Sequence, residues 1–172
     1  EKENRTYKCS NNHCFDIAKQ GYVNLLQSQQ SKLKRHGDDK LMINSRTAFL
    51  DKGYYKPLQK EICQKLLKHL GENPVVLDAG CGDCYYTAEI EKALGNKNPE
   101  IIGIDISKDA VISASKRSKS ISLVVAGVFS MPVKDSSCDA VLNVFSPFAP
   151  DEYSRVLKDD GVIIVAYIMN DY

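Results

Sequence analysis

The chain has 172 residues, of which 43% are hydrophobic and 26% are charged, a composition typical of one soluble globular domain with room for a small additional module. No apolar run approaches the roughly 18 residues that a membrane-spanning helix needs, and the polar N-terminus is unlike a signal peptide. We therefore expect a cytoplasmic protein with no membrane partner, whose six cysteines are reduced thiols.

Positive charge is concentrated in the first part of the chain, although the formal net charge of the whole is only +1. Residues 1–70 contain 14 Lys and Arg against 7 Asp and Glu, whereas residues 71–172 contain 9 against 15. This asymmetry indicates either that the first half binds a polyanion or that the two halves dock on each other and neutralise part of their charge.

The beginning of the chain lacks the periodicity of long helices. Residues 1–30 are polar and rich in turn residues, which predicts a small module, and residues 31–43 are typical of an exposed linker. From Asn44 onward apolar residues recur at helical spacing. A second helix follows, with Pro57 in its first turn and Gly71 as its stop.

Short apolar runs then alternate with helical segments. Such an order predicts a parallel sheet covered by helices on both faces, which is the doubly wound, Rossmann-like α/β fold. The predicted strands are residues 75–78, 101–105, 123–126, 139–144 and 161–166, and the predicted helices are residues 85–94, 108–119 and 150–157.

A glycine turn follows the first of these strands, where residues 77–82 read Leu-Asp-Ala-Gly-Cys-Gly. Gly80 permits a tight turn, Gly82 lets a ligand approach the backbone, and the next helix offers free N–H groups at its start. Asp105 ends the second strand 23 positions after Gly82, close to the spacing of a carboxylate that binds ribose hydroxyls. Alternatively, Asp105 caps the next helix, a role for which Ser107 competes.

The glycine turn favours S-adenosylmethionine (SAM) over a dinucleotide as the cofactor. A dinucleotide site needs a third small residue at position 85, where this chain has Tyr85. Asp78 suits a cationic sulfonium ligand, because a carboxylate near a positive charge is favourable. We therefore predict a class I SAM-dependent methyltransferase.

Cys9 and His13 have a C-x₃-H spacing at which a thiolate and an imidazole can share a zinc ion. A structural zinc site needs four ligands, so the pair alone favours an incidental arrangement. Cys81 and Cys84 form a C-x₂-C pair, but they lie inside the cofactor turn, which favours packing over metal binding.

Four stretches of the sequence carry a family resemblance. They are C-x₃-H-x-F-D-x-A-K-x-G-Y-V-N-L-L at 9–26, R-x-A-F-L-D-x-G-x-Y-x-P-L at 46–58, L-D-A-G-C-G-D-C-Y-Y-T at 77–87 and G-I-D-I-S-K at 103–108. The first two are far more specific than the general SAM motif. With these stretches the chain resembles the bacterial large-subunit ribosomal RNA (guanine-N1)-methyltransferases, a family with an N-terminal zinc module.

The resemblance implies that the protein transfers a methyl group from SAM to N1 of a guanine in a hairpin of large-subunit ribosomal RNA, and that it forms a homodimer. It implies that Tyr55, Gly82 and Asp83 contact SAM. It also implies that Cys9 and His13 are the last two of four zinc ligands.

The resemblance also sets the expected domains. These are an N-terminal module for zinc binding and RNA recognition over residues 1–36, and a methyltransferase domain over residues 37–172. The first Cys pair of the family's zinc module does not occur in this chain, nor do the family's strands after the fifth. We therefore expect an incomplete zinc module and a sheet without its C-terminal strands.

A polar and aromatic segment follows the fourth predicted strand. Asn143, Phe145 and Pro147 lie there, at the carboxyl edge of the sheet where open α/β folds bind ligands. We expect this segment to border the guanine pocket. The alternative is that Phe145 and Phe148 are core residues.

Lys32, Lys34 and Arg35 form the sharpest basic cluster of the chain. Contacts of these side chains with phosphates would make RNA affinity fall steeply with salt. The cluster is a candidate RNA-binding surface, and the alternative is a solvated linker.

Two other functions remain open from the residues alone. The Rossmann-like half equally fits a methyltransferase of a small molecule, because a fold does not fix its substrate. A sheet without its last strands also fits a non-catalytic RNA-binding module. The basic first half counts against the former, and the intact cofactor turn counts against the latter.

Overall fold

The computed structural model of the chain describes residues 2–3, 5–9, 11–26 and 37–168. These residues form one sheet of three strands, one sheet of six strands and five α-helices. None of the described helices is long and apolar enough to span a membrane. The predicted basic cluster of Lys32, Lys34 and Arg35 lies outside the described residues.

The elements follow one another in the order that the sequence predicts from residue 56 onward. The strands are β1 (Lys2–Glu3), β2 (Thr6–Lys8), β3 (Cys14–Asp16), β4 (Val23–Asn24), β5 (Val75–Ala79), β6 (Glu100–Asp105), β7 (Ser122–Val125), β8 (Cys138–Val144) and β9 (Leu157–Ala166). The helices are α1 (Lys40–Leu50), α2 (Lys56–His69), α3 (Tyr85–Leu94), α4 (Lys108–Arg117) and α5 (Pro150–Val156).

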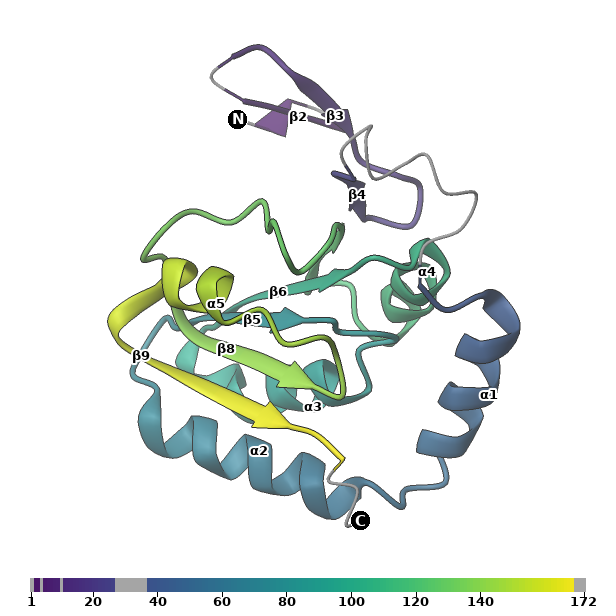
Figure 1. Cartoon of the computed structure of the whole chain (residues 1–172), viewed down its shortest axis with the longest axis vertical. Coiled ribbons are helices and arrows are strands. Elements are labelled where there is room, and N and C mark those ends of the chain that lie inside the picture. Colours follow the sequence, from purple (N-terminus) through teal and green to yellow (C-terminus); the bar gives the residue numbers. More distant parts are fainter. Residues whose placement is uncertain (1, 4, 10, 27–36, 169–172) are drawn as a thin grey trace.

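The six strands of the large sheet are parallel and lie in the order β4-β7-β6-β5-β8-β9. From the central β5 the chain moves outward to β6 and β7, then crosses to β8 and β9 on the other side (Figure 1). Open α/β sheets bind ligands at the carboxyl edge where the order reverses, here between β5 and β8. The predicted doubly wound, Rossmann-like fold is confirmed.

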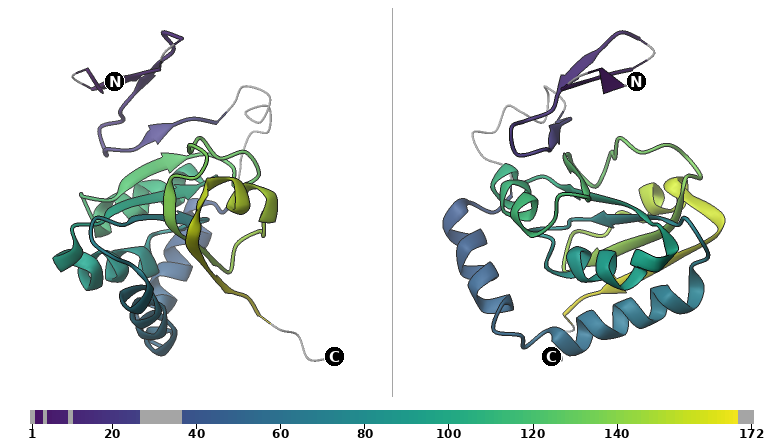
Figure 2. Two further views of the ribbon diagram at one scale, coloured as in Figure 1. Left: turned by 90° about the vertical axis from the view of Figure 1, so that its left-hand side faces the viewer. Right: turned by 180° about the vertical axis from the view of Figure 1, so that it is seen from behind.

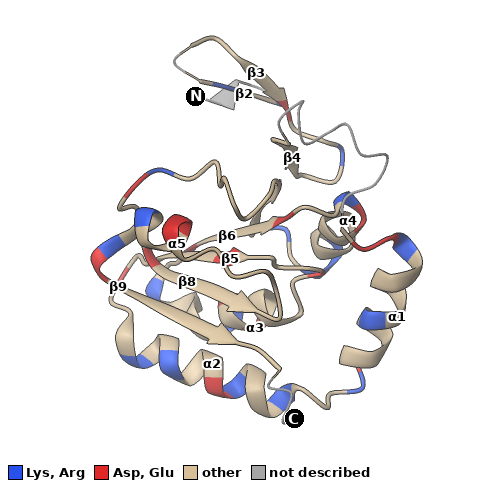
Figure 3. Cartoon of the chain, viewed as in Figure 1, with Lys and Arg blue, Asp and Glu red and all other residues tan. Residues whose placement is uncertain are grey.

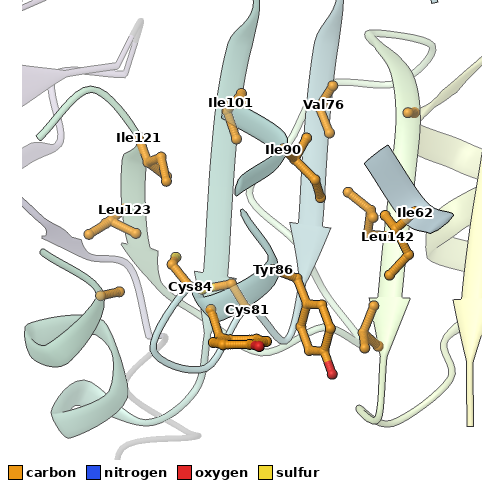
Figure 4. Packing of buried hydrophobic residues seen from close by; sticks show 14 of the residues in the cluster. Ile62, Val76, Cys81, Cys84, Tyr86, Ile90, Ile101, Ile121, Leu123 and Leu142 are labelled. Atoms are coloured by element: carbon orange, nitrogen blue, oxygen red, sulfur yellow. The ribbon is translucent and has the colours of Figure 1, made fainter. Parts of the chain in front are cut away.

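The strand side chains alternate between two apolar layers, because successive residues of a strand point to opposite faces. Val76 and Leu142 pack in the layer that contains residues of α2, α3 and α4, whereas Leu77 and Val141 pack in the layer of α5. Figure 4 shows the first layer, with Ile90 of α3 lying against the strands. Helices thus cover both faces of the sheet.

Helix α1 begins at Lys40, four residues before the predicted start at Asn44, so the end of the predicted linker is helical. The carboxylate of Asp39 caps this helix by accepting a hydrogen bond from the N–H of Met42 (2.9 Å). Leu41 and Met42 are exposed. The first turn therefore carries no buried stripe that would reveal it in the sequence.

The N-terminal segment is joined to the large sheet through β4. Within the predicted module of residues 1–36, Val23 of β4 pairs in parallel with Val124 of β7. Strands β1 to β3 form a separate antiparallel sheet, which projects beyond this edge in both views of Figure 2. A strand of two residues is too short to be recognised from its apolar pattern.

Much of the positive charge in the described part of the first half lies on α2. This helix carries four Lys and one Glu, and the Lys residues follow its length in Figure 3. Helix α2 lies at the opposite end of the molecule from the small sheet (Figure 1). The described basic residues are therefore spread over both ends of the molecule and do not mark one binding surface for a polyanion.

Candidate cofactor and substrate site

The glycine turn between β5 and α3 bends through left-handed backbone conformations. Gly80 and Gly82 have φ values of +89° and +54°, which residues with a Cβ adopt only with strain. The N–H groups of Gly80 and Cys81 both donate to the carbonyl of Ile104 in β6 (2.8 and 2.9 Å). Gly82 faces open space, since no described atom lies within 4 Å of the position that a Cβ would take.

Asp105 closes this turn from the end of β6. Its Oδ2 accepts a hydrogen bond from the N–H of Gly82 (2.9 Å), and its Oδ1 accepts one from the N–H of Ser107 (2.7 Å). Each oxygen keeps a lone pair with which it can accept from a ribose hydroxyl. The competing role of helix cap belongs to Ser107, whose hydroxyl accepts from the N–H of Ala110 (3.2 Å).

Asp78 is buried beneath the glycine turn. Its Oδ2 accepts a hydrogen bond from the hydroxyl of Thr87 on α3 (2.5 Å). Burial raises the pKa of Asp78 to about 6, against the effect of the Thr87 hydrogen bond and with a further contribution from the charge of Asp105. Asp78 thus ties α3 to β5, while its effect on a cationic cofactor stays a prediction.

Asp83 follows the glycine turn and is held by two helices. Its Oδ2 accepts hydrogen bonds from Oγ1 of Thr47 on α1 (2.6 Å) and from Nη2 and Nε of Arg117 on α4 (2.7 and 3.1 Å). Its Oδ1 accepts a weaker bond from the N–H of Tyr85 (3.2 Å). Both oxygens therefore have partners within the chain, and the contact of Asp83 with SAM stays a prediction.

Aromatic side chains from distant parts of the chain meet at the carboxyl edge of the sheet. The ring centroid of Phe145 lies 5.7 Å from that of Tyr55 and 6.5 Å from that of Tyr86. Tyr55 also contacts Phe49, with 6.1 Å between the centroids. Phe145 is 44% exposed and Phe148 is 53% exposed, so neither is a core residue.

The segment after β8 is held in place by Asn143. Its buried side-chain amide lies within hydrogen-bond distance of the hydroxyl of Ser146 (2.6 Å), the carbonyl of Pro147 (2.9 Å) and the hydroxyl of Tyr153 (2.7 Å). Phe145 in this segment has a φ of +55°, which is strained for a bulky residue. Asn143 therefore shapes the segment from within, and its place at the guanine pocket stays a prediction.

The same segment rests on the glycine turn. The hydroxyl of Ser146 donates to the carbonyl of Ala79 (2.6 Å). A Cβ on Gly80 would lie 2.3 Å from the Cβ of Ser146. A glycine is therefore needed at position 80 for this approach, and the segments predicted for the cofactor and for the guanine are in direct contact.

Two tyrosine hydroxyls at the start of α3 are buried without a hydrogen-bond partner among the described residues. They belong to Tyr85 and Tyr86, whose rings are perpendicular with centroids 5.1 Å apart. Leaving a buried hydroxyl unpaired costs about 1–3 kcal/mol. Burial raises the pKa of both phenols further above neutral pH, so both hydroxyls carry a proton that they can donate. In Figure 4 the Tyr86 hydroxyl points toward the carboxyl ends of the strands.

These features fit SAM. Gly82 leaves the backbone open to a ligand, Asp105 offers two acceptor oxygens for hydroxyls, and the hydroxyl of Tyr86 is an orphaned polar group at the same edge. Sequence reasoning missed Tyr86, because a tyrosine at the start of a helix carries no local signal of an unpaired hydroxyl.

Cys9 and His13 face each other across the turn between β2 and β3. The Sγ of Cys9 lies 3.4 Å from Nδ1 of His13, and the N–H of Cys9 donates to the carbonyl of His13 (3.1 Å). The pair fits half of a tetrahedral zinc site. No cluster of three metal-ligating side chains occurs within the described ranges. Cys81 and Cys84 are buried in the apolar core, in line with packing.

Comparison with known proteins identifies the family of the α/β domain. Residues 76–161, which are half of the chain, match a family model described as a methyltransferase domain. The chain belongs to this methyltransferase family. A methyltransferase domain agrees with the SAM site that the glycine turn predicts. Residues 1–34 match a zinc-ribbon model described as "RlmA, N-terminal", which confirms the predicted kind of module.

Relatives of this methyltransferase confirm the predicted resemblance. It is 34% identical to the 23S rRNA (guanine(748)-N(1))-methyltransferase of Streptomyces fradiae over 171 residues, which are 98% of this chain and 59% of that protein. It is 32% identical to YxjB of Bacillus subtilis over 171 residues, which are 93% of this chain and 57% of that one. The chain thus spans less than two thirds of the length of these relatives.

A solved structure agrees with the fold. A SAM-dependent methyltransferase from Aquifex aeolicus superposes with a TM-score of 0.56 at 23% identity, over 71% of this chain and 69% of that one. At this identity the likeness establishes the fold alone. It agrees with the parallel sheet that the strand pairing of this methyltransferase describes.

Proposed function

We propose that the protein transfers a methyl group from SAM to N1 of a guanine in a hairpin of large-subunit ribosomal RNA. One observation carries the proposal: similarity to the Streptomyces fradiae enzyme covers 98% of this chain and includes the zinc-ribbon stretch as well as the methyltransferase core. The malonyl-[acyl-carrier protein] O-methyltransferase of Hamiltonella defensa, by contrast, is similar over 116 residues, or 62% of the chain. A small-molecule substrate is therefore the weaker alternative.

The aromatic cluster supports the proposal because it suits an extruded base. A guanine must leave its stack before a methyl group can reach N1, and aromatic side chains commonly receive such a base. Phe145 is partly exposed at the carboxyl edge and lies against Tyr55. Asn143 and the carbonyl of Pro147 hold the Phe145 segment in a fixed shape. We assign to this segment the rim of the guanine pocket.

Methylation of guanine N1 requires that N1 is positioned next to the methyl donor and that its proton is removed. Guanine N1 carries a proton at neutral pH and its lone pair is conjugated, so it is a weak nucleophile. SAM supplies an electrophilic methyl group when it is bound. The chain's own part is to hold N1 in line with that methyl group, and the contact of Ser146 with the glycine turn sets the two binding segments side by side. A general base would add about 10²–10⁴-fold.

The N-terminal part is proposed to serve RNA recognition. Cys9 and His13 would hold zinc together with two further ligands, which would fix the turn between β2 and β3. Lys32, Lys34 and Arg35 would contact phosphates of the RNA. The resemblance further suggests a homodimer, and the composition of the chain suggests that it works in the cytoplasm.

The test is methyl transfer from labelled SAM to large-subunit ribosomal RNA that lacks the modification, with the full-length protein. We expect one methyl group per RNA on N1 of one guanine, mapped by mass spectrometry of nuclease fragments. RNA that already carries the methyl group serves as the control and takes up none. A protein that binds SAM but labels neither RNA would contradict the proposal.

A further inference from the structure

The hydroxyl of Tyr86 has no partner in the described fold. Tyr86 is only 9% exposed, and its hydroxyl is buried without a hydrogen bond to any described residue. Native structures contain few such groups, and each one calls for an explanation such as a ligand. Tyr85 carries a second unpaired hydroxyl. The surroundings of the two must therefore decide which one belongs to the site.

The two hydroxyls lie in different environments. Tyr85 lies under Arg117, whose guanidinium carbon is 5.6 Å from the ring centroid, on the side of the ion pairs that hold α1. Tyr86 lies on the other side, where its ring contacts Phe145. Burial raises the pKa of Tyr86, and the neighbouring Tyr55, Tyr85 and Asp78 raise it further. Phe145, which covers the ring of Tyr86, is itself 44% exposed. Tyr86 is thus the tyrosine that faces the carboxyl edge of β5 and β8.

The two ends of SAM must lie along this edge. Asp105 at the end of β6 is the predicted acceptor for the ribose hydroxyls, and β5 separates β6 from β8 in the sheet. With the ribose at Asp105, the amino-acid end of SAM would extend from β6 toward β5 and β8, where Tyr86 lies. Asp78 and Asp105 make the surroundings acidic, so the carboxylate of that end needs a donor close to it.

We propose that the Tyr86 hydroxyl donates a hydrogen bond to the carboxylate at the methionine end of SAM. This makes Tyr86 a positioning residue, because it holds the end of the cofactor next to the reacting sulfonium. The inference rests on SAM as the cofactor of the proposed reaction and not on the RNA substrate. It accounts for a buried hydroxyl that the fold itself does not use.

Two tyrosine variants and two ligands test the inference by calorimetry on the full chain. S-adenosylhomocysteine has the amino-acid end of SAM, whereas 5′-methylthioadenosine lacks it. Tyr86→Phe should bind S-adenosylhomocysteine about tenfold more weakly than the wild type and 5′-methylthioadenosine equally well. Tyr85→Phe is the matched control and should bind both ligands as the wild type does. RNA is not in the assay, so failure of RNA methylation leaves this result unaffected.

Three outcomes would overturn the inference. The first is unchanged affinity of Tyr86→Phe for S-adenosylhomocysteine. The second is an equal loss of affinity for both ligands, which would indicate a packing effect of the ring. The third is a lower melting temperature of ligand-free Tyr86→Phe, which would show that the hydroxyl has a partner within the protein. We expect both variants to melt at or above the wild-type temperature, because neither loses a hydrogen bond.

Discussion

Asp83 and Arg117 form the most buried ion pair in the described part of the chain. Nη2 of Arg117 lies 2.7 Å from Oδ2 of Asp83, and the two side chains are 23% and 5% exposed. Arg117 also contacts Asp51 at the end of α1 (2.9 Å). The pair therefore joins the cofactor turn to both α1 and α4, and through them to the segment that carries Tyr55.

Arg117→Ala should lower the free energy of unfolding by about 2 kcal/mol, because it leaves a buried carboxylate without its main counter-ion. The hydrogen bond from Thr47 to Asp83 limits the loss. Urea denaturation followed by circular dichroism measures it. The control is Lys92→Ala, which removes the exposed ion pair with Glu89 and should cost less than about 0.5 kcal/mol. Equal losses in the two variants would show that burial adds nothing to the Asp83 pair.

Gly80→Ala should mainly lower the stability of the fold, whereas Gly82→Ala should mainly weaken ligand binding. The new methyl group at position 80 would meet Ser146, so we expect a loss of stability of about 2 kcal/mol or more. The methyl group at position 82 meets no described atom within 4 Å, so only the cost of a positive φ, about 1–2 kcal/mol, applies. Gly82→Ala should instead weaken S-adenosylhomocysteine binding, measured by calorimetry, because it fills the approach to the backbone.

A second substitution checks the cause of the Gly80 effect. Ser146→Gly removes the atoms that the methyl group would meet, so it should restore part of the stability that Gly80→Ala loses. The same substitution should not help Gly82→Ala. If Ser146→Gly shifted both variants equally, the collision would not be the reason for the loss.

The central strands could be predicted because buried parallel strands are continuous apolar runs. The predicted strand 75–78 is β5, and the other predicted strands of the core agree with β6, β7 and β8 within about one residue. The last strand was predicted from Gly161, whereas β9 begins at Leu157. Residues 158–160 are charged, so the apolar pattern does not reveal this part of the strand. Lys158 is held to the sheet by an ion pair with Asp139 (2.8 Å).

The cofactor turn could be predicted because its determinants are local. Gly80 and Gly82 lie within one turn, and Asp105 ends the adjacent strand. The contacts that hold the site together are not local: Thr47 reaches Asp83 across 36 positions and Ser146 reaches Ala79 across 67. The spacing of residues in a single sequence does not predict such contacts. They depend on the docking of α1 and of the segment after β8.

Asp105→Asn separates ligand binding from helix capping. The amide retains one acceptor oxygen for the backbone but presents an NH₂ group where ribose hydroxyls need an acceptor. We expect affinity for S-adenosylhomocysteine to fall at least about tenfold, with a modest loss of stability. Ser107→Ala is the control, because it removes the helix cap and should cost about 1 kcal/mol of stability while binding stays unchanged. Weak binding in the Ser107 variant alone would reverse the two assignments.

Asp78 should make the folded chain less stable as the pH rises through mild acid. Burial raises its pKa to about 6 from an ordinary 3.8, so between these values the folded chain binds a proton that the unfolded chain has released. The free energy of unfolding therefore falls by about 3 kcal/mol from about pH 4 to pH 6 on account of this group and stays lower above it.

The variant Asp78→Asn tests this prediction, because it keeps an oxygen for the Thr87 hydroxyl and has no charge to bury. Its stability should equal that of the wild type near pH 4 and exceed it at pH 7. Urea denaturation of both proteins at several pH values gives the difference, in which the carboxylates that do not interact with Asp78 cancel. A difference that does not grow between pH 4 and pH 6 would mean that Asp78 ionises in the fold as it does in water.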